Sequence, residues 1–265
     1  MKNLCFNNET GYIDFHTHLD WYNPEDELIS QLKKFNGIIV AASCDDKSFE
    51  KNLQLEQSVI HLEESGELAP GTVKILPTFG IHPMNAAKAS SNLTVYDSYC
   101  NQSFMIGEIG MDFCWYKDAS EARQEEVFRY FLQHCHESKK YCVIHTKDAE
   151  EKICRILEEY PDAKPIIHWY DGPEDVFKEM CCRNYYQTFG CQTIRSKSIQ
   201  QLLQITPKNL ILCETDNPSS EPWLGGTDNS IFLIQRIYKD LASLLKMNLD
   251  DFKKMVNQNA RKIIC

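Results

Sequence analysis

Short apolar runs alternate along the chain with longer amphipathic stretches. Each run is rich in Ile, Val, Tyr or Phe and has about the length of a strand. The runs cover residues 12–19, 37–44, 73–83, 103–112, 140–146, 165–170, 184–191 and 209–216. Between them lie segments with apolar side chains at helical spacing, such as 120–140, which begins with Ser120 as a candidate N-cap. A second clear helical pattern, 249–264, closes the chain.

Eight candidate strands with long connections favour a parallel sheet, because parallel neighbours need a crossover of about a dozen residues or more. Eight is also the number of strands that closes a barrel, and about 250 residues are typical of one. The chain has 265 residues, of which 43% are hydrophobic. The sequence therefore predicts an α/β fold, a (β/α)8 TIM barrel, with a doubly wound open sheet as the alternative. No linker or low-complexity tract divides residues 1–265, so we expect a single domain.

Composition narrows the possible partners and the compartment. Acidic residues outnumber basic ones by 38 to 28, and a net charge of −10 argues against avid non-specific DNA binding. Bound divalent ions would invert that field locally, so a DNA substrate is still allowed. Twelve cysteines without a CxxC pair indicate buried structural thiols rather than a zinc ribbon or a disulfide scaffold. Without a signal-peptide pattern or a membrane-length apolar run, the sequence predicts a cytoplasmic protein.

Candidate metal ligands lie at the C-terminal ends of the predicted strands. In a closed barrel these ends converge at one rim, where barrel enzymes place their catalytic groups. Four imidazoles and two carboxylates suit two divalent ions such as Zn²⁺, Mn²⁺ or Mg²⁺. Taken singly, each residue has a structural alternative, such as a hydrogen-bonded core histidine, and only the shared position favours a metal site. The set is His16, His18, Glu108, His145, His168 and Asp216.

Five motifs, in this order, resemble the signatures of the TatD family of metal-dependent deoxyribonucleases and hydrolases, part of the amidohydrolase-like superfamily. They are DFHTHLD (14–20), GIHP (80–83), GEIGMD (107–112), IHTKDA (144–149) and CETDNP (213–218). The resemblance extends from about Asp14 to Ile264. It implies a TIM barrel and two divalent metal ions, and two such ions can share a bridging hydroxide as the nucleophile. It also often implies 3′→5′ exonuclease activity on single-stranded DNA.

The resemblance also implies a role for each matching residue. His16, His18 and Asp216 would hold one ion, His145 and His168 would hold the other, and Glu108 would bridge both. Asp216 is in addition the candidate general base. His82, from the GIHP motif, would lie close to the site and contact substrate without being a regular ligand. Its alternative is a loop residue whose geometry Pro83 fixes.

Two further basic residues are candidates for phosphate contacts. Lys147 stands where the family pattern has arginine. Its ammonium group can contact a phosphate as a point charge, but it cannot form the bidentate pair of hydrogen bonds that a guanidinium group forms. Arg195 follows the seventh predicted strand, and barrels often bind phosphate near strands seven and eight. A solvated basic loop is the alternative for Arg195. The sequence also departs from the family pattern after His168, where residues 169–172 read WYDG instead of the usual Cys-Phe-Ser-Gly.

Asp14 and Glu214 each lie two residues before a candidate ligand, so they face the same side of their strands. They are candidates to orient the ligand imidazoles, with a buried structural hydrogen bond as the alternative. The expected substrate is single-stranded DNA or another phosphodiester, and no membrane or obligate protein partner is expected. A hydrolase of other esters or amides, including an aminoacyl-tRNA deacylase, is the rival function. A non-catalytic binding barrel is a more distant one.

Overall fold

The computed structural model describes residues 11–265, and within them the chain forms eight strands in two sheets. The strand order is β1-β2-β3 in one sheet and β4-β5-β6-β7-β8 in the other. The strands are β1 (Tyr12–Thr17), β2 (Gly37–Ala41), β3 (Val73–Pro77), β4 (Ile106–Asp112), β5 (Tyr141–Lys147), β6 (Lys164–Ile167), β7 (Tyr186–Phe189) and β8 (Ile211–Cys213). Each of the eight apolar runs therefore coincides with most of a strand or includes one, as predicted.

Helices connect the strands. They are α1 (Glu25–Leu32), α2 (Asp46–Glu64), α3 (Asp97–Gln102), α4 (Glu121–Ser138), α5 (Glu150–Glu158), α6 (Glu174–Cys182), α7 (Gln192–Arg195), α8 (Lys197–Ile205), α9 (Ser220–Trp223), α10 (Leu233–Leu244) and α11 (Leu249–Ile264). Short 3-10 turns cover Leu19–Trp21, Pro83–Asn85, Leu93–Tyr96 and Lys208–Leu210. The predicted cap of α4 is confirmed, because the Ser120 side chain accepts a hydrogen bond from the Arg123 N–H at 3.2 Å.

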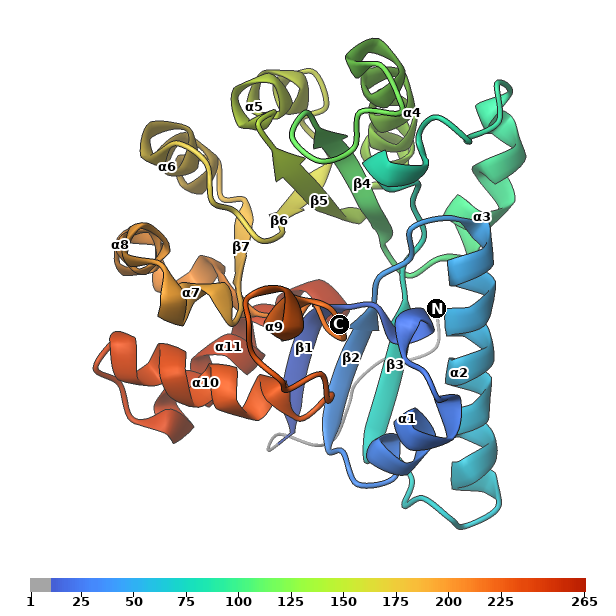
Figure 1. Ribbon diagram of the computed structural model, residues 1–265, viewed down its shortest axis with the longest axis vertical. Helices are drawn as coiled ribbons and strands as arrows, with labels where there is room; N and C mark the ends of the chain where they lie inside the picture. The colour runs from blue at the N-terminus through green and yellow to red at the C-terminus, as the bar shows by residue number, and fades with distance from the viewer. Residues whose placement is uncertain (1–10) are drawn as a thin grey trace. The chain divides into compact units, whose positions relative to one another are not determined.

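The chain divides into two compact units that interleave along the sequence. Among the described residues, the first unit comprises 11–41, 52–76 and 188–265. In it, β1 pairs in parallel with β2, and α10 and α11 pack against β1 and β8 (Figure 1). Asp216 N–H donates to the His16 carbonyl at 2.9 Å, so the segment after β8 is fixed beside the end of β1. The prediction of a single domain stays a prediction.

The second unit comprises residues 42–51 and 77–187. Its strands β4, β5 and β6 and the start of β7 lie in parallel order, with α4 packed on β4 and β5 and with α5 on β5 (Figure 1). All seven residues of β4 are buried, which fits a parallel sheet covered on both faces. Gly110 is required here, because a Cβ at this position would lie 2.0 Å from the His145 carbonyl oxygen.

The cysteines and the helices bear on two expectations drawn from composition, buried structural thiols and the lack of a membrane span. Cys44, Cys142 and Cys213 are buried, and every cysteine among the described residues is a free thiol, as predicted for structural cysteines. Within residues 11–265, no helix combines the length and the apolarity that a membrane span requires. A cytoplasmic location stays a prediction.

Candidate metal centre

The first group of candidate ligands lies in the first unit, where β1 ends beside the segment that follows β8. His16 and His18 place their Nε2 atoms 3.4 Å apart. The Oδ1 atom of Asp216 lies 3.5 Å from His16 Nε2 and 3.3 Å from His18 Nε2. Both histidines are buried, whereas the Asp216 side chain is 23% exposed. Three donor atoms therefore converge on one point that solvent can approach from the Asp216 side.

These spacings fit a bound metal ion better than they fit direct hydrogen bonds. Zn–N and Zn–O bonds of about 2.0–2.1 Å at tetrahedral angles place neighbouring donor atoms about 3.3–3.4 Å apart. Hydrogen bonds to these nitrogens would usually be about 2.7–3.2 Å long. The three measured distances, 3.3, 3.4 and 3.5 Å, agree with the first range. The donor set of two imidazoles and one carboxylate is also one that zinc and manganese accept.

Backbone contacts and ring stacking hold this group in place. His18 N–H donates to the Asn217 carbonyl at 2.9 Å, next to the bond between Asp216 N–H and the His16 carbonyl. Asp216 itself has a left-handed backbone, with φ of 54°. Such a conformation costs about 1 kcal/mol or more in a non-glycine residue and often marks a functional site. The Trp21 ring stacks on His18 with centroids 4.1 Å apart.

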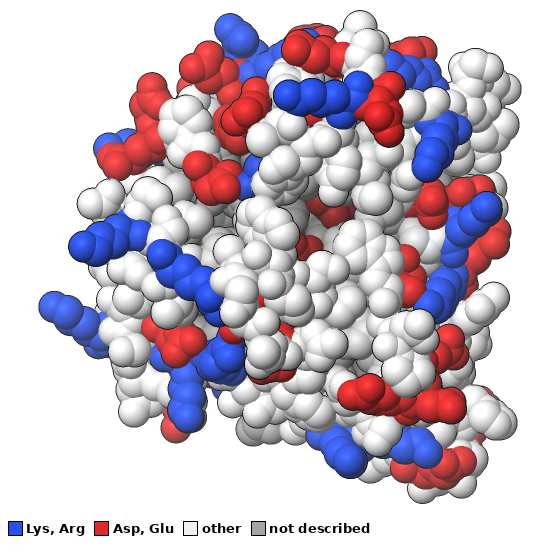
Figure 2. Space-filling model, viewed as in Figure 1, with Lys and Arg blue, Asp and Glu red and all other residues white. Residues whose placement is uncertain are grey.

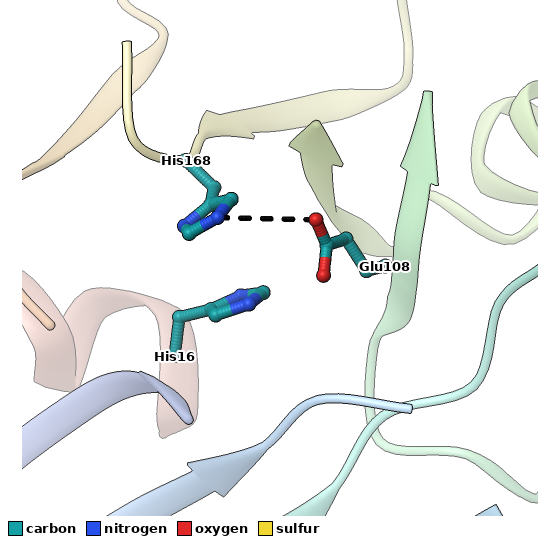
Figure 3. Close-up of side chains that lie close together, drawn as sticks. All are labelled: His16, Glu108 and His168. Carbon is teal, nitrogen blue, oxygen red and sulfur yellow. Dashed lines mark ion pairs between the residues drawn. The ribbon is translucent and has the colours of Figure 1, made fainter. Parts of the chain in front are cut away.

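The second group lies in the second unit, with Glu108 in β4, His145 in β5, His168 directly after β6 and His82 in the segment after β3. Glu108 Oε1 is 2.9 Å from His145 Nδ1 and 3.8 Å from His168 Nε2, the pair drawn with a dashed line in Figure 3. His82 Nε2 is 3.3 Å from the same carboxylate oxygen and 3.2 Å from His145 Nδ1. All four side chains are almost completely buried. Glu108, which could have been a turn residue between glycines, is thus the centre of three imidazoles.

His82 differs from the other histidines in its tautomer. The backbone N–H of Met84 lies 3.0 Å from His82 Nδ1, and because an amide N–H can only donate, Nδ1 must accept. In the neutral ring the proton is then on Nε2, the atom that faces Glu108 and His145. That nitrogen can donate a hydrogen bond but offers no lone pair to a metal ion. Pro83 and the turn that follows it fix this geometry.

Asp112, the last residue of β4, makes a contact that the sequence analysis did not anticipate. Its Oδ2 lies 2.9 Å from His145 Nε2, so the ring of His145 is held between Asp112 and Glu108. The other oxygen of Asp112 accepts hydrogen bonds from the N–H groups of Cys114 and Trp115. The signal was in the sequence, because Glu108 and Asp112 are four residues apart on one strand and share a face.

Comparison with known proteins decides the family. Residues 13–264 match the family described as TatD related DNase. The chain belongs to the TatD family. An uncharacterized metal-dependent hydrolase of Methanocaldococcus jannaschii is 27% identical over 262 residues, which cover 96% of this chain and 97% of the relative. The human deoxyribonuclease TATDN3 is 23% identical over 271 residues, covering 96% of this chain and 94% of its own.

Solved structures show the fold. The TatD homolog YjjV of Escherichia coli matches 95% of this chain and 97% of its own, with a TM-score of 0.80 and 17% identity. A TatD family hydrolase of Entamoeba histolytica matches 96% of this chain and 97% of its own, with a TM-score of 0.79 and 16% identity. The fold class is therefore the predicted α/β (β/α)8 barrel. As a TatD protein, the chain is a metal-dependent hydrolase that acts on ester bonds.

The remaining candidate residues of this TatD protein are engaged in specific contacts. Lys147 is buried, and its Nζ lies 2.5 Å from Asp171 Oδ1. Arg195 donates to Glu221 Oε1 at 2.9 Å and to the Leu224 carbonyl at 2.6 Å, and its side chain is 40% exposed. A phosphate contact of Arg195 stays a prediction, as does the alternative of a solvated basic residue. Neither ion pair could be predicted, because each joins segments that are distant in the sequence.

Asp14 is a buried residue that joins β1 to the segment after β8. Its carboxylate accepts hydrogen bonds from the backbone and the hydroxyl of Thr215, at 2.9 and 2.6 Å, and from the His16 N–H at 3.3 Å. Burial raises its pKa to about 7, although these hydrogen bonds oppose the shift. Asp14 thus orients the backbone on which His16 lies. Glu214 is also buried, and its N–H donates to the Phe189 carbonyl at the end of β7.

Proposed function

We propose that this TatD protein is a 3′→5′ exodeoxyribonuclease that hydrolyses phosphodiester bonds in single-stranded DNA with two divalent ions. The observation that carries the proposal is that imidazole and carboxylate donors converge in two groups, one of His16, His18 and Asp216 and the other of His82, Glu108, His145 and His168. Two ions are the usual solution for in-line displacement at phosphorus. The name of the human relative, a deoxyribonuclease, supports a nucleic acid substrate.

In this proposal His16, His18 and Asp216 hold one ion, and His145 and His168 hold the other. Glu108 is a ligand of both, as the family resemblance implies. When bound, the ions would supply a water of lowered pKa and would stabilise charge on a phosphoryl oxygen. Catalytic groups of TIM barrels lie at the C-terminal ends of the strands. His16 and His145 lie near the ends of β1 and β5, whereas His18, His168 and Asp216 follow β1, β6 and β8, and Glu108 lies within β4.

The protein's own groups would move the proton and position the substrate. Asp216 is the proposed general base, because it is the most exposed of the candidate ligands and its carboxylate can accept a proton from the attacking water. His82 presents a proton on Nε2 and is suited to donate a hydrogen bond to a substrate oxygen. Lys147 is the proposed phosphate contact in the second unit. Arg195 would contribute N–H donors beyond the two that bind Glu221 and Leu224.

A ladder experiment on defined oligonucleotides tests the proposal. A 5′-labelled single strand should shorten stepwise from its 3′ end when Mg²⁺, Mn²⁺ or Zn²⁺ is supplied, and a blocked 3′ end should prevent this. The Asp216→Asn variant serves as the matched control and should lose activity by about a hundredfold or more while its fold is retained. No cleavage with any of the three metals, together with hydrolysis of another ester, an amide or an aminoacyl-tRNA, would favour the rival hydrolase.

A further inference from the structure

We propose that Asp171 determines how much negative charge the substrate site accepts, because its carboxylate competes with the substrate's phosphate for Lys147. This inference rests on the proposed function only in taking a phosphate group as the anion of the substrate. It assigns a role to a residue at which the chain departs from the TatD pattern.

Lys147 is the last residue of β5 and lies two residues beyond His145, so both side chains belong to the same face of the strand. Its side chain is only 6% exposed, whereas that of Asp171 is 42% exposed. The ammonium group contacts Asp171 Oδ1 at 2.5 Å and donates to the Trp169 carbonyl at 3.4 Å. The loop after β6 therefore covers the cation that stands next to a candidate metal ligand.

The loop after β4 covers the same ammonium group from another direction. Lys147 Nζ lies 5.1 Å from the ring centroid of Trp115, and that ring is 6.4 Å from the His145 ring. Trp115 is 45% exposed, so the enclosure is open to solvent on the outer side of the indole. An anion that approaches from this side would meet Trp115 and Asp171 before it reaches Lys147.

The loop that carries Asp171 has its shape for reasons other than the ion pair. Trp169 has a left-handed backbone with φ of 45°, and the buried Tyr170 donates its hydroxyl proton to the Pro173 carbonyl at 2.6 Å. Gly172 leaves room for Glu150, because a Cβ at this position would lie 2.5 Å from Glu150 Cγ. Loss of the Asp171 charge should therefore leave the loop in place and expose the ammonium group.

An exchange of partners follows from this arrangement. A phosphate can pair with Lys147 only when Asp171 turns outward into water, and the half-exposed position of Asp171 allows that movement. One ion pair then replaces another, so Lys147 adds little net attraction for a polyanion. With a neutral side chain at position 171, the phosphate would be the first anion that the ammonium group meets.

Equilibrium binding of inorganic phosphate, measured by calorimetry, tests the proposal without any need for catalysis. Asp171→Ser and Asp171→Asn should each tighten phosphate binding by roughly five- to tenfold. The gain should vanish in the Lys147→Ala background. Asp171→Glu keeps the charge and should stay within about twofold of the wild type. Asp148→Asn, which removes a neighbouring exposed carboxylate, is the matched control. Its phosphate affinity should also stay within about twofold of the wild type.

Three results would overturn the inference. One is unchanged phosphate affinity in both neutral variants, once thermal melting shows that they are folded. Another is an equal gain in the Lys147→Ala background, and the third is a gain of the same size in Asp148→Asn. The outcome is separable from that of the proposed function. DNA cleavage with unchanged phosphate affinity removes only the role of Asp171, whereas the expected affinities without any DNA cleavage remove only the nuclease proposal.

Discussion

His145 is held between two carboxylates, and this determines how its ring behaves before a metal ion binds. Burial lowers the pKa of His145, but hydrogen bonds and charge from Asp112 and Glu108 outweigh that effect and raise the pKa to about 9. In the metal-free protein at pH 7 the ring is therefore an imidazolium. A metal ion must displace its proton, so metal affinity should fall as the pH drops below about 9, by up to tenfold per unit.

Asp112→Asn tests the role of Asp112 as a positioning residue. A partner that orients a ligating histidine typically contributes ten- to a hundredfold in metal affinity, so the dissociation constant should rise by about tenfold or more at pH 9. The neutral amide also removes one cause of the raised His145 pKa, so less proton competition remains below pH 9. The difference between variant and wild type should therefore shrink at pH 7. Calorimetric titration with Zn²⁺ or Mn²⁺ at both pH values measures it.

Asp97→Asn is the matched control for this prediction. Asp97 also pairs with a histidine, His134, at 3.0 Å, but this pair lies on the half-exposed surface of α3 and α4. Metal affinity should not change in that variant. An Asp112→Asn protein that binds metal as tightly as the wild type at pH 9 would show that Asp112 serves only the turn of Cys114 and Trp115.

At the scale of elements, the segment after β8 is held by an ion-pair cluster as well as by its backbone. Glu221 in α9 is almost fully buried and accepts from Arg195 of α7 at 2.9 Å and from Arg236 of α10 at 2.5 Å. Gly226 is needed beside it, because a Cβ there would lie 2.5 Å from Glu221 Oε1. Ion pairs of Glu221 with α7 and α10 thus hold the segment that begins with Asp216, in addition to its backbone hydrogen bonds.

Glu221→Ala should lower the free energy of unfolding by about 1–3 kcal/mol. Removing the buried partner leaves two arginines without their shared carboxylate, and their partial exposure moderates the loss. Urea denaturation measures the change. Glu67→Ala provides the control, because Glu67 pairs with Lys33 at 2.7 Å on the surface, and its loss should leave the free energy of unfolding almost unchanged. Equal losses in the two variants would mean that burial adds nothing to the Glu221 cluster.

The elements also show where the sequence pattern was informative. The eight apolar runs predicted the existence of every strand, because strands of a covered parallel sheet are nearly continuous hydrophobic segments. Their ends were less predictable. The run 209–216 continues as far as Asp216, but β8 ends at Cys213. Glu214 and Thr215, which follow β8, are fully buried although they lie outside the strand, so burial extends further along the chain than the strand does.

The residues proposed as ligands could be identified from the sequence, whereas most of the contacts that support them could not. His16, His18 and Asp216 could be found because position at strand ends and motif order both point to them. The contact between Lys147 and Asp171 depends on how two loops fold, which no spacing rule predicts. The same is true of Glu221 and its two arginines. Strand parity places Glu108 and Asp112 on one face of β4, but the contact of Asp112 with His145 also depends on how β4 pairs with β5.

At the scale of the whole molecule, folding should not depend on metal. Each unit has its own buried apolar side chains, and a chain of this size does not need an ion to fold as a zinc finger does. Treatment with a chelator should therefore abolish hydrolysis and leave the far-UV circular dichroism spectrum unchanged. Activity should return when Mn²⁺ or Zn²⁺ is added in excess. Loss of helical signal on metal removal would identify one of the two groups as a structural site.

The distribution of charge on the surface does not favour non-specific binding of nucleic acid. Among the described residues on the face shown in Figure 2, acidic and basic side chains are interspersed and form no continuous basic surface. With a net charge of −10, long-range attraction of a polyanion is weak. Recognition of a nucleic acid would then depend on short-range contacts at the ends of the strands.

The turn after Asp112 carries an exposed thiol, Cys114, that can be labelled chemically. Cys114, whose N–H donates to Asp112, is exposed, whereas most of the other described cysteines are buried. Burial of a thiol suppresses its reaction with alkylating reagents at neutral pH, because the thiolate is the reactive species. A maleimide dye should therefore attach at Cys114, with Cys182 and Cys265 as the other exposed positions, which serine substitutions would remove. A fluorophore on Cys114 would report directly on the loop that touches His145.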